Sequence, residues 1–319
     1  MKSVVTITMN PSIDQSCQTP FVTDEKKLRC KEVRFDPGGG GINVSRAIKI
    51  FGGKSIAIYP SGGYTGALLK ELLNEKGIDQ IPLTVSEPTR INVSVFETNS
   101  EKQYRFNMPG ILLQDQEWKQ VIQQLEQCNP YPDFIVASGS LPPGVPKDFY
   151  KTLARFSHKN GCKLIVDSSH EPLQEALHEG IFLMKPNLKE FMFLTDKEIE
   201  DESQIIRKAQ EIIKNQQCEV IVISLGAAGA YYITSETFTH IPSPLVPLSS
   251  RVGAGDCMVA GITYQLSLGN SIDQAIFYGI AAGAAAAMTP GTELCKKEDT
   301  ERLYHLILKK RIKLHDCHF

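Results

Sequence analysis

Short apolar runs rich in β-branched residues alternate with longer amphipathic segments along most of this chain. The apolar runs cover residues 4–8, 55–59, 134–137, 163–166 and 220–224, and the amphipathic segments cover 42–51, 65–75, 115–127, 147–159 and 203–214. The first pattern is typical of buried strands and the second of surface helices. Their alternation predicts an α/β fold, in which helices cover both faces of a mostly parallel sheet. From residue 255 onward the pattern is helical, ending with a helix over 300–310.

Two regions interrupt this alternation. Residues 14–35 and 89–107 carry short polar and apolar alternations without intervening helices, as in Gln103-Tyr104-Arg105-Phe106. Strands of this kind pair with one another more readily than they join a parallel sheet. We therefore expect one chain of 1–319 with an α/β core of about 1–13, 36–88 and 108–319, and a small antiparallel β lobe inserted as about 14–35 and 89–107.

The composition limits the function classes. A total of 34 Lys and Arg against 36 Asp and Glu gives a net charge of −2, which argues against a nucleic-acid or anionic-membrane surface as the main binding partner. The eight cysteines form no CxxC pair, which is typical of a reduced cytoplasmic protein. The N-terminus lacks a signal-peptide pattern, and the longest apolar stretch, 275–288, is too short to span a bilayer.

A glycine turn near the C-terminal end delivers a carboxylate into the first turn of an apolar helix. The turn is Val252-Gly253-Ala254-Gly255-Asp256. Backbone N–H groups at a helix N-terminus hold anionic oxygens, and glycine allows close approach. The helix dipole should keep Asp256 ionised near neutrality, so that it can accept a proton. The segment therefore suits phosphoryl transfer.

Four consecutive glycines, Gly38 to Gly41, precede a second amphipathic helix. Each ordered glycine costs roughly 0.5–1 kcal/mol relative to alanine, so close approach to a ligand is favoured over a merely flexible turn. No Gly-Lys-Ser/Thr ending follows, which excludes a Walker A loop. No G-x-G-x-x-G fingerprint follows the first strand either, which weakens a nicotinamide-dependent reading.

Two further motifs each have an ordinary and a functional interpretation. The first is Lys185-Pro186-Asn187-Leu188-Lys189-Glu190. Its Asn187 and Glu190 could form a capping box at the start of a helix, or they could position a magnesium ion through water ligands. The segment from Ser224 to Gly229, with Gly226 between them, follows a strand. It fits a plain hairpin, or the wall of a nucleotide crevice at the carboxyl edge of the sheet.

Basic residues in the predicted lobe are candidates for binding a phosphate. They are Lys27, Arg29, Arg90 and Arg105. Solvated surface is the ordinary role of such residues, and it stays open for Lys27 and Arg105. Arg90 is the better candidate for a bidentate phosphate contact, because it begins a strand beside Thr89 and Asn92. Asp14, just past the first strand, is expected to accept hydrogen bonds from substrate hydroxyls or to cap a turn.

Together these motifs resemble the ribokinase-like (PfkB) sugar kinase family. The loop of residues 38–43, the motif from Lys185 to Glu190 and the segment from Gly253 to Asp256 follow the family's order and spacing, and the resemblance extends over roughly residues 3–308. Within the family, Asn10-Pro11-Ser12-Ile13-Asp14 and the segments 41–46 and 138–144 are similar to the branch that acts on phosphorylated hexoses. Relatives acting on fructose 1-phosphate or tagatose 6-phosphate commonly carry lysine at the position of Gly40.

The resemblance implies a three-layer α/β/α core with a β-sheet lid that also forms a homodimer interface. It implies transfer of the γ-phosphoryl of ATP to the C1 hydroxyl of fructose 6-phosphate, with Asp256 as base and the amides of residues 253–256 as the anion hole. The implied substrate contacts are Asp14, Lys27, Arg29, Gly38, Gly39, Gly40, Asn43, Arg90, Arg105 and Ser140. The implied nucleotide contacts are Lys185, Asn187, Ser224, Gly226, Gly229, Ile280 and Ala284.

The same resemblance implies two metal ions. Glu190, with Asn187, would organise Mg²⁺. A K⁺ site would use oxygens of Ser250, Val252, Ala286, Thr289, Gly291 and Glu293, although the chain departs from the family pattern at Thr289 and Glu293. Tagatose 6-phosphate and fructose 1-phosphate are the alternative substrates. A catalytically weak sugar-phosphate sensor is the alternative from another functional class, and the intact Asp256 and Glu190 argue against it.

Overall fold

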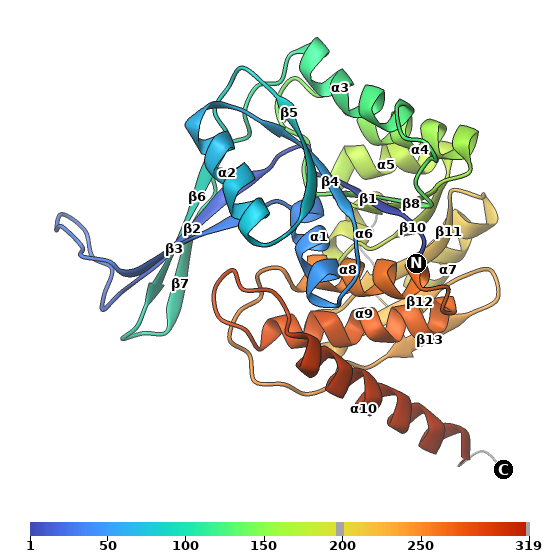
Figure 1. Cartoon of the computed structure of the whole chain (residues 1–319). Coiled ribbons are helices and arrows are strands. Elements are labelled where there is room, and N and C mark those ends of the chain that lie inside the picture. The colour runs from blue at the N-terminus through green and yellow to red at the C-terminus, as the bar shows by residue number, and fades with distance from the viewer. Residues whose placement is uncertain (196–200, 317–319) are drawn as a thin grey trace.

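The computed structural model describes residues 1–195 and 201–316, so Cys317 lies outside the described residues. A nine-stranded sheet forms the centre, in the order β13-β12-β11-β10-β9-β8-β1-β4-β5 (Figure 1). Its strands are β1 (Val4–Ile7), β4 (Ile56–Ser61), β5 (Asp79–Thr84), β8 (Phe134–Ser138), β9 (Lys163–Asp167), β10 (Ile181–Met184), β11 (Cys218–Ser224), β12 (Ala230–Ile233) and β13 (Phe238–Ile241). The predicted α/β class is confirmed.

The strands from β5 across to β11 all run parallel. β12 and β13 complete the sheet as antiparallel strands, with β13 at the edge, and the sequence pattern did not reveal them. Both are four residues long, as β1 is, but AYYI and FTHI lack the run of β-branched residues that marks β1 (VVTI) as a strand. The sheet is therefore mixed at one edge and parallel elsewhere.

Alternate residues of the central strands supply two separate cores. In β11, Val220 and Val222 pack on one face while Ile221 and Ile223 pack on the other. The first face is covered by α1 (Gly40–Ile50), α8 (Ala254–Ser267), α9 (Ile272–Ala287) and α10 (Lys297–Asp316). The second is covered by α3 (Asp115–Glu126), α4 (Phe149–Asn160), α5 (His170–Glu179) and α7 (Glu202–Lys214). Helix α2 (Gly63–Glu75) packs near β4 and the short α6 (Leu188–Leu194) follows β10.

A separate four-stranded sheet, which we call the lid, projects from the core (Figure 1). It consists, in spatial order, of β3 (Lys31–Gly38), β2 (Ser12–Thr19), β6 (Arg90–Glu97) and β7 (Lys102–Phe106). β2–β3 and β6–β7 are antiparallel pairs. The central pair is parallel, with Ser12 opposite Arg90, so the expectation of a wholly antiparallel lobe is wrong. β2 and β6 leave the ends of β1 and β5, which are themselves parallel strands, and therefore enter the lid in the same direction.

No helix among the described residues has both the length and the apolar character needed to cross a membrane.

Candidate active site

Polar residues gather where the parallel strands end. Asp167 is the last residue of β9, Lys185 follows β10 and Ser224 ends β11. β1 pairs with β4 on one side and with β8 on the other, so the chain reverses its winding direction there. Ligand crevices of α/β sheets form at the carboxyl ends of the strands beside such a switch point. The fold therefore brings several predicted site residues to one edge.

The four-glycine loop packs directly on this switch point. Gly39 has φ +111°, and a Cβ there would lie 2.6 Å from Cγ2 of Thr8, at the end of β1. A Cβ on Gly40 would collide with the Ser138 hydroxyl, at the end of β8. The chain's own packing thus accounts for these glycines without a ligand, which the sequence alone did not show. A role of Gly38, Gly39 and Gly40 in substrate binding stays a prediction.

Asp256 lies in the first turn of α8, three residues after the N-cap residue Gly253, whose backbone is in the left-handed conformation with φ 74°. Its Oδ2 accepts a hydrogen bond of 2.8 Å from Nδ2 of Asn43 in α1. Burial, together with the carboxylates of Asp167 and Asp14, raises the pKa of Asp256 from 3.8 to about 6, while Asn43 and Lys185 act in the opposite direction. Burial therefore outweighs the stabilisation of the anion expected at a helix N-terminus. Asp256 is still mostly ionised at neutral pH.

A buried ion pair lies against the glycine turn. Nζ of Lys185 is 3.1 Å from Oδ1 of Asp167, and both side chains are largely buried. The same Nζ is 3.3 Å from the position that a Cβ of Gly255 would take. Burial opposes the charge of Lys185, but the carboxylates of Asp167, Glu190 and Asp256 outweigh it and raise its pKa. Sequence reasoning gave Asp167 no role, although a carboxylate that ends an apolar strand was an available signal.

Asn187 and Glu190 form the ordinary capping box. The Asn187 side chain accepts from Glu190 N at 3.0 Å, and the Glu190 carboxylate accepts from Asn187 N at 2.8 Å. Ser224 lies beside them, because its N–H donates to Pro186 O at 2.9 Å. Residues 224–229 turn the chain from β11 into the antiparallel β12, as a hairpin does, and this hairpin lies at the carboxyl edge.

Asp14 lies at the base of the lid. It accepts hydrogen bonds from Ser12 Oγ at 2.8 Å and from Asn92 Nδ2 at 2.9 Å. A small hollow between the lid and the core is lined by Asp14, Asn92, Arg105 and Thr292, among other residues. Ser140, from the turn after β8, accepts from Asn10 Nδ2 at 3.0 Å on the core side. The strand register and the shared hollow place Asp14 and Arg105 on the same, core-facing side of the lid.

The other basic residues of the lid behave differently. Arg90 donates to three main-chain carbonyls, those of Met108 at 2.8 Å, Asn10 at 3.0 Å and Pro11 at 3.3 Å. The guanidinium therefore links the lid to the core through contacts with the protein's own main chain. Lys27 and Arg29 lie exposed in the loop between β2 and β3. Within the described part of the chain, no hydrogen bond or ion pair joins them to the other candidate residues.

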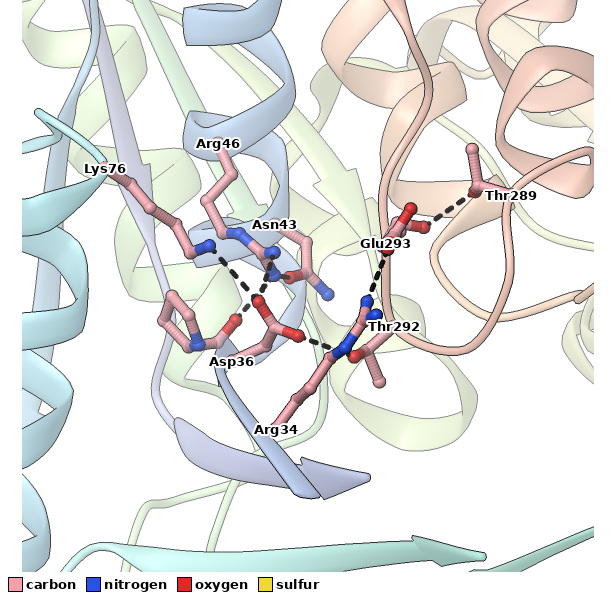
Figure 2. A network of polar contacts seen from close by, with 9 residues as sticks. Arg34, Asp36, Asn43, Arg46, Lys76, Thr289, Thr292 and Glu293 are labelled. Atoms are coloured by element: carbon pink, nitrogen blue, oxygen red, sulfur yellow. Dashed lines mark hydrogen bonds and ion pairs between the residues drawn. The ribbon is translucent and has the colours of Figure 1, made fainter. Parts of the chain in front are cut away.

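Oxygen atoms converge where the segment before α8 meets the segment after α9. Ser250 Oγ donates to Gly291 O at 3.0 Å and accepts from Val252 N at 3.1 Å. Thr289 Oγ1 contacts the carbonyls of Ala286 at 2.8 Å and Glu293 at 2.9 Å. The Glu293 carboxylate, by contrast, turns to Arg34 of the lid at 2.7 Å (Figure 2). Ile280 and Ala284 of α9 are both buried in the core.

A polar network that sequence reasoning missed joins the lid to this segment. Asp36, in β3, contacts Arg46 of α1, Lys76 after α2 and Thr292 after α9 (Figure 2). Arg46 lies three residues after Asn43, on the same helix, and donates to its Oδ1 at 2.9 Å. The i, i+3 spacing was the available signal for that contact.

Comparison with known proteins gives consistent matches. The model of the pfkB family carbohydrate kinases matches residues 3–299. The chain is 40% identical over 305 residues to the ATP-dependent 6-phosphofructokinase isozyme 2 of Escherichia coli, covering 95% of this chain and 98% of that protein. It is also 40% identical over 306 residues to the isozyme 2 of Mycobacterium tuberculosis, covering 95% of this chain and 89% of that protein.

The solved structures of the E. coli protein show the same fold. Its phosphofructokinase-2 in complex with potassium matches with a TM-score of 0.92 and 39% identity, covering 97% of this chain and 100% of that chain. The complex with fructose-6-phosphate matches with a TM-score of 0.90 and 38% identity, at the same coverage. A tetrameric inhibited form of that protein matches with a TM-score of 0.90 and 39% identity, again at the same coverage.

Proposed function

This chain belongs to the pfkB family of carbohydrate kinases, and we propose that it transfers the γ-phosphoryl group of ATP to the C1 hydroxyl of fructose 6-phosphate. The products are fructose 1,6-bisphosphate and ADP, as in glycolysis. One observation of the structure carries the proposal. Asp256 lies at the N-terminus of α8, at the carboxyl edge of the sheet, with its carboxylate held by Asn43 at 2.8 Å.

Asp256 is suited to be the general base. Its pKa of about 6 leaves it ionised at neutral pH and yet basic enough to take a proton from a hydroxyl group. The hydroxyl oxygen then attacks the phosphorus of the transferred group while the bond to the leaving ADP oxygen breaks. A base typically contributes about 10² to 10⁴ in rate, so positioning and neutralisation of charge must supply the rest.

The anion hole is assigned to the backbone of Gly253, Ala254 and Gly255. These residues begin a helix of 14 residues, whose first N–H groups have no partner within the helix. Lys185 lies against Gly255 and adds a positive charge at that point. Negative charge that develops on the phosphoryl oxygens would therefore meet a prearranged positive environment.

ATP and Mg²⁺ are assigned to the neighbouring part of the carboxyl edge. No cluster of three or more His, Cys, Asp or Glu side chains that could hold a metal ion occurs among the described residues. That fits Mg²⁺, which commonly takes one or two carboxylates together with water and substrate phosphates. Glu190 is the carboxylate we assign, with Asn187 beside it. When bound, the ion neutralises phosphate charge. Ser224, Gly226 and Gly229 would line the nucleotide site.

A K⁺ ion fits the place where the segment before α8 meets the segment after α9. Only oxygen atoms, which are hard metal ligands, converge there, and they belong to Ser250, Ala286, Thr289, Gly291 and Glu293. We assign them, with Val252, as the monovalent-cation site, using the main-chain carbonyl of Glu293, because its carboxylate pairs with Arg34.

The sugar phosphate is assigned to the hollow between the lid and the core. Asp14 and Asn43 would accept or donate hydrogen bonds to the sugar hydroxyls, and Arg105 would contact the phosphate. Arg90 keeps two of its five N–H donors for a ligand, because three donate to carbonyls. Lys27 and Arg29 would reach the phosphate only through movement of the exposed loop that carries them.

We further propose a homodimer formed through the lid. The face of the lid that points away from the core carries a row of four residues across the strands, Phe35, Gln15, Val93 and Phe106, in which only Gln15 is polar. Val33, Phe35 and Phe106 are 50%, 41% and 52% exposed. An apolar sheet face of this kind is a favourable surface for a second copy of the chain.

A cytoplasmic location is proposed as well, and the free thiols of the described cysteines support it.

A coupled ADP-release assay tests the function. The purified chain is offered fructose 6-phosphate, tagatose 6-phosphate and fructose 1-phosphate, each with and without K⁺, at fixed Mg²⁺ and ATP. We expect the highest kcat/KM with fructose 6-phosphate and a gain on adding K⁺. A higher kcat/KM with either of the other sugars would replace the substrate assignment. Silence with all three, together with tight sugar-phosphate binding, would favour a sensor.

A further inference from the structure

Asp36 is the centre of a network that joins four separate parts of the chain. Its Oδ1 contacts Arg46 Nη2 at 3.3 Å and Lys76 Nζ at 3.2 Å, and its Oδ2 accepts from Thr292 Oγ1 at 2.9 Å (Figure 2). The side chains of Arg46 and Asp36 are only 8% and 14% exposed. A buried carboxylate with three donors from different elements holds those elements in a fixed relation.

Arg46, which Asp36 holds in place, is itself hydrogen-bonded to Asn43. Its Nη1 donates to Pro37 O at 2.7 Å and to Oδ1 of Asn43 at 2.9 Å. A guanidinium has only donors, so the Asn43 amide must present its oxygen to Arg46. The NH₂ group of the amide then points to Asp256, to which it donates at 2.8 Å. A reversed amide would bring NH₂ against the guanidinium and oxygen against the carboxylate, so both contacts would become repulsive.

We propose that Arg46, anchored by Asp36, is a positioning residue that locks the Asn43 amide so that it donates to Asp256 and keeps this residue available as a base. The inference deepens the proposed function, on which it rests for the role of Asp256. Arg46 itself does not contact the reacting groups in this arrangement. It acts through Asn43, and a change at Arg46 should alter the proton affinity of Asp256.

Other charged groups also face Asp256, and the experiment must separate their effects. Asp14 lies on β2, Asp167 at the end of β9 and Lys185 after β10, and each affects Asp256 electrostatically. The charge of Arg46 also acts on Asp256 through space, without contact. A variant that keeps the charge of Arg46 but not its planar fork therefore isolates the orientation of the amide.

The test compares Arg46→Met with Arg46→Lys. Aspartate labelled with ¹³C at the side-chain carboxyl is incorporated, and the resonance that disappears in Asp256→Asn is followed through a pH titration of the free protein. We expect the midpoint of Asp256 to rise by about one unit in Arg46→Met, which is a tenfold change in proton affinity. Arg46→Lys should show a smaller rise in the same direction, because the charge remains while the double donation is lost.

Kinetics provide a second readout. In Arg46→Met, a midpoint of about 7 leaves about a tenth of Asp256 ionised at pH 6, against about half in the parent. The value of kcat at pH 6 should therefore fall about fivefold and recover as the pH is raised, while KM for ATP stays near that of the parent. A loss that is equal at every pH would indicate only structural damage and would overturn the proposal. So would an unchanged Asp256 titration in both variants, provided that circular dichroism shows them folded.

Arg34→Gln is the matched control. Arg34 also forms an ion pair between the lid and the core, but it lies on the lid itself, its partner is Glu293 and both side chains are exposed. The Asp256 midpoint should not move in this variant, and a shift as large as that of Arg46→Met would overturn the specific role of Arg46. If the parent protein phosphorylates none of the sugars, the proposed function fails, whereas the titration still decides the relation between Arg46 and Asp256.

Discussion

Lys185 and Asp167 form a buried ion pair, with 3.1 Å between Nζ and Oδ1, directly against the glycine turn that carries Asp256. The pair comes from the ends of two neighbouring parallel strands, β9 and β10. It acts on the candidate base in both directions, because Asp167 raises the pKa of Asp256 and Lys185 lowers it. The proton affinity of Asp256 is thus set by groups more than 70 residues away in sequence.

Removing the carboxylate of Asp256 should abolish most of the turnover. We expect Asp256→Asn to lower kcat by about 10² to 10⁴, since the general base is lost, while ATP still binds. The parent protein should lose kcat/KM below pH 6, as Asp256 becomes protonated with a pKa of about 6. Steady-state kinetics across pH and isothermal titration with ATP measure these effects. Near-normal turnover of the variant would eliminate Asp256 as the base.

The same substitution should stabilise the free protein at high pH. The pKa of Asp256 is raised from 3.8 to about 6 on folding, so the native state binds more protons than the unfolded state between these values. Stability is therefore lost as the pH rises through this window. Asp256→Asn removes the effect, and its gain should be at most about 3 kcal/mol at pH 8 and close to zero at pH 4. Urea unfolding of both proteins at the two pH values measures the difference.

Breaking the buried ion pair should cost both stability and activity. Lys185→Met leaves Asp167 buried without its cation, which typically costs about 3–5 kcal/mol. The double variant Lys185→Met/Asp167→Asn removes both charges and should regain most of the stability. Its kcat should stay low, because the positive charge beside Gly255 is still missing. Chemical denaturation and kinetics on the same samples separate the two effects, and full recovery of kcat would argue against a catalytic role for Lys185.

Gly39 is predicted to tolerate no side chain, for two separable reasons. Gly39→Ala places an alanine at φ +111° and its Cβ 2.6 Å from Cγ2 of Thr8. Thr8→Ser removes that methyl group but keeps the hydroxyl, which accepts from Ile42 N at 2.7 Å. The double variant should recover the steric part and leave about 1 kcal/mol or more of backbone strain.

Gly139→Ala is the closer control for the strain, because Gly139 has φ +108° and a Cβ there would meet only Gly40 N, at 3.6 Å. The loss in thermal stability of Gly39→Ala should clearly exceed that of Gly139→Ala. Equal losses would mean that contact with Thr8 does not matter.

A charge on the outer face of the lid should dissociate the proposed dimer. Phe35→Asp puts a carboxylate into the row that contains Val93 and Phe106. Burying an unpaired charge between two copies is strongly unfavourable, so the dissociation constant should rise at least 100-fold. Sedimentation equilibrium measures the change. Tyr64→Lys is the control, since Tyr64 is 96% exposed and belongs to α2 instead of the lid. An unchanged mass for Phe35→Asp would place the interface elsewhere.

The predicted strands and helices of the core follow from local patterns. Val220 to Ile223 alternate between two apolar faces, and such a run can be satisfied only inside a covered sheet. Strands β12 (AYYI) and β13 (FTHI) escaped prediction because they lack the run of β-branched residues that marks the equally short β1 (VVTI) as a strand. The parallel pairing of β2 with β6 escaped it for a different reason. Strand direction within the lid depends on where β1 and β5 deliver the chain, which no local pattern contains.

The sequence by itself determined which chemical groups are present and which segments carry them. Glycine turns, helix starts and a carboxylate in the first turn of α8 are local features, and they identify Asp256 without knowledge of distant contacts. Only the tertiary structure decided the environment of that carboxylate. Asn43, Asp167 and Lys185 reach it from α1, β9 and the end of β10, and Arg46 acts on it through Asn43. Proton affinity depends on burial and on charges a few ångströms away in space, and these distances exist only after the chain has folded.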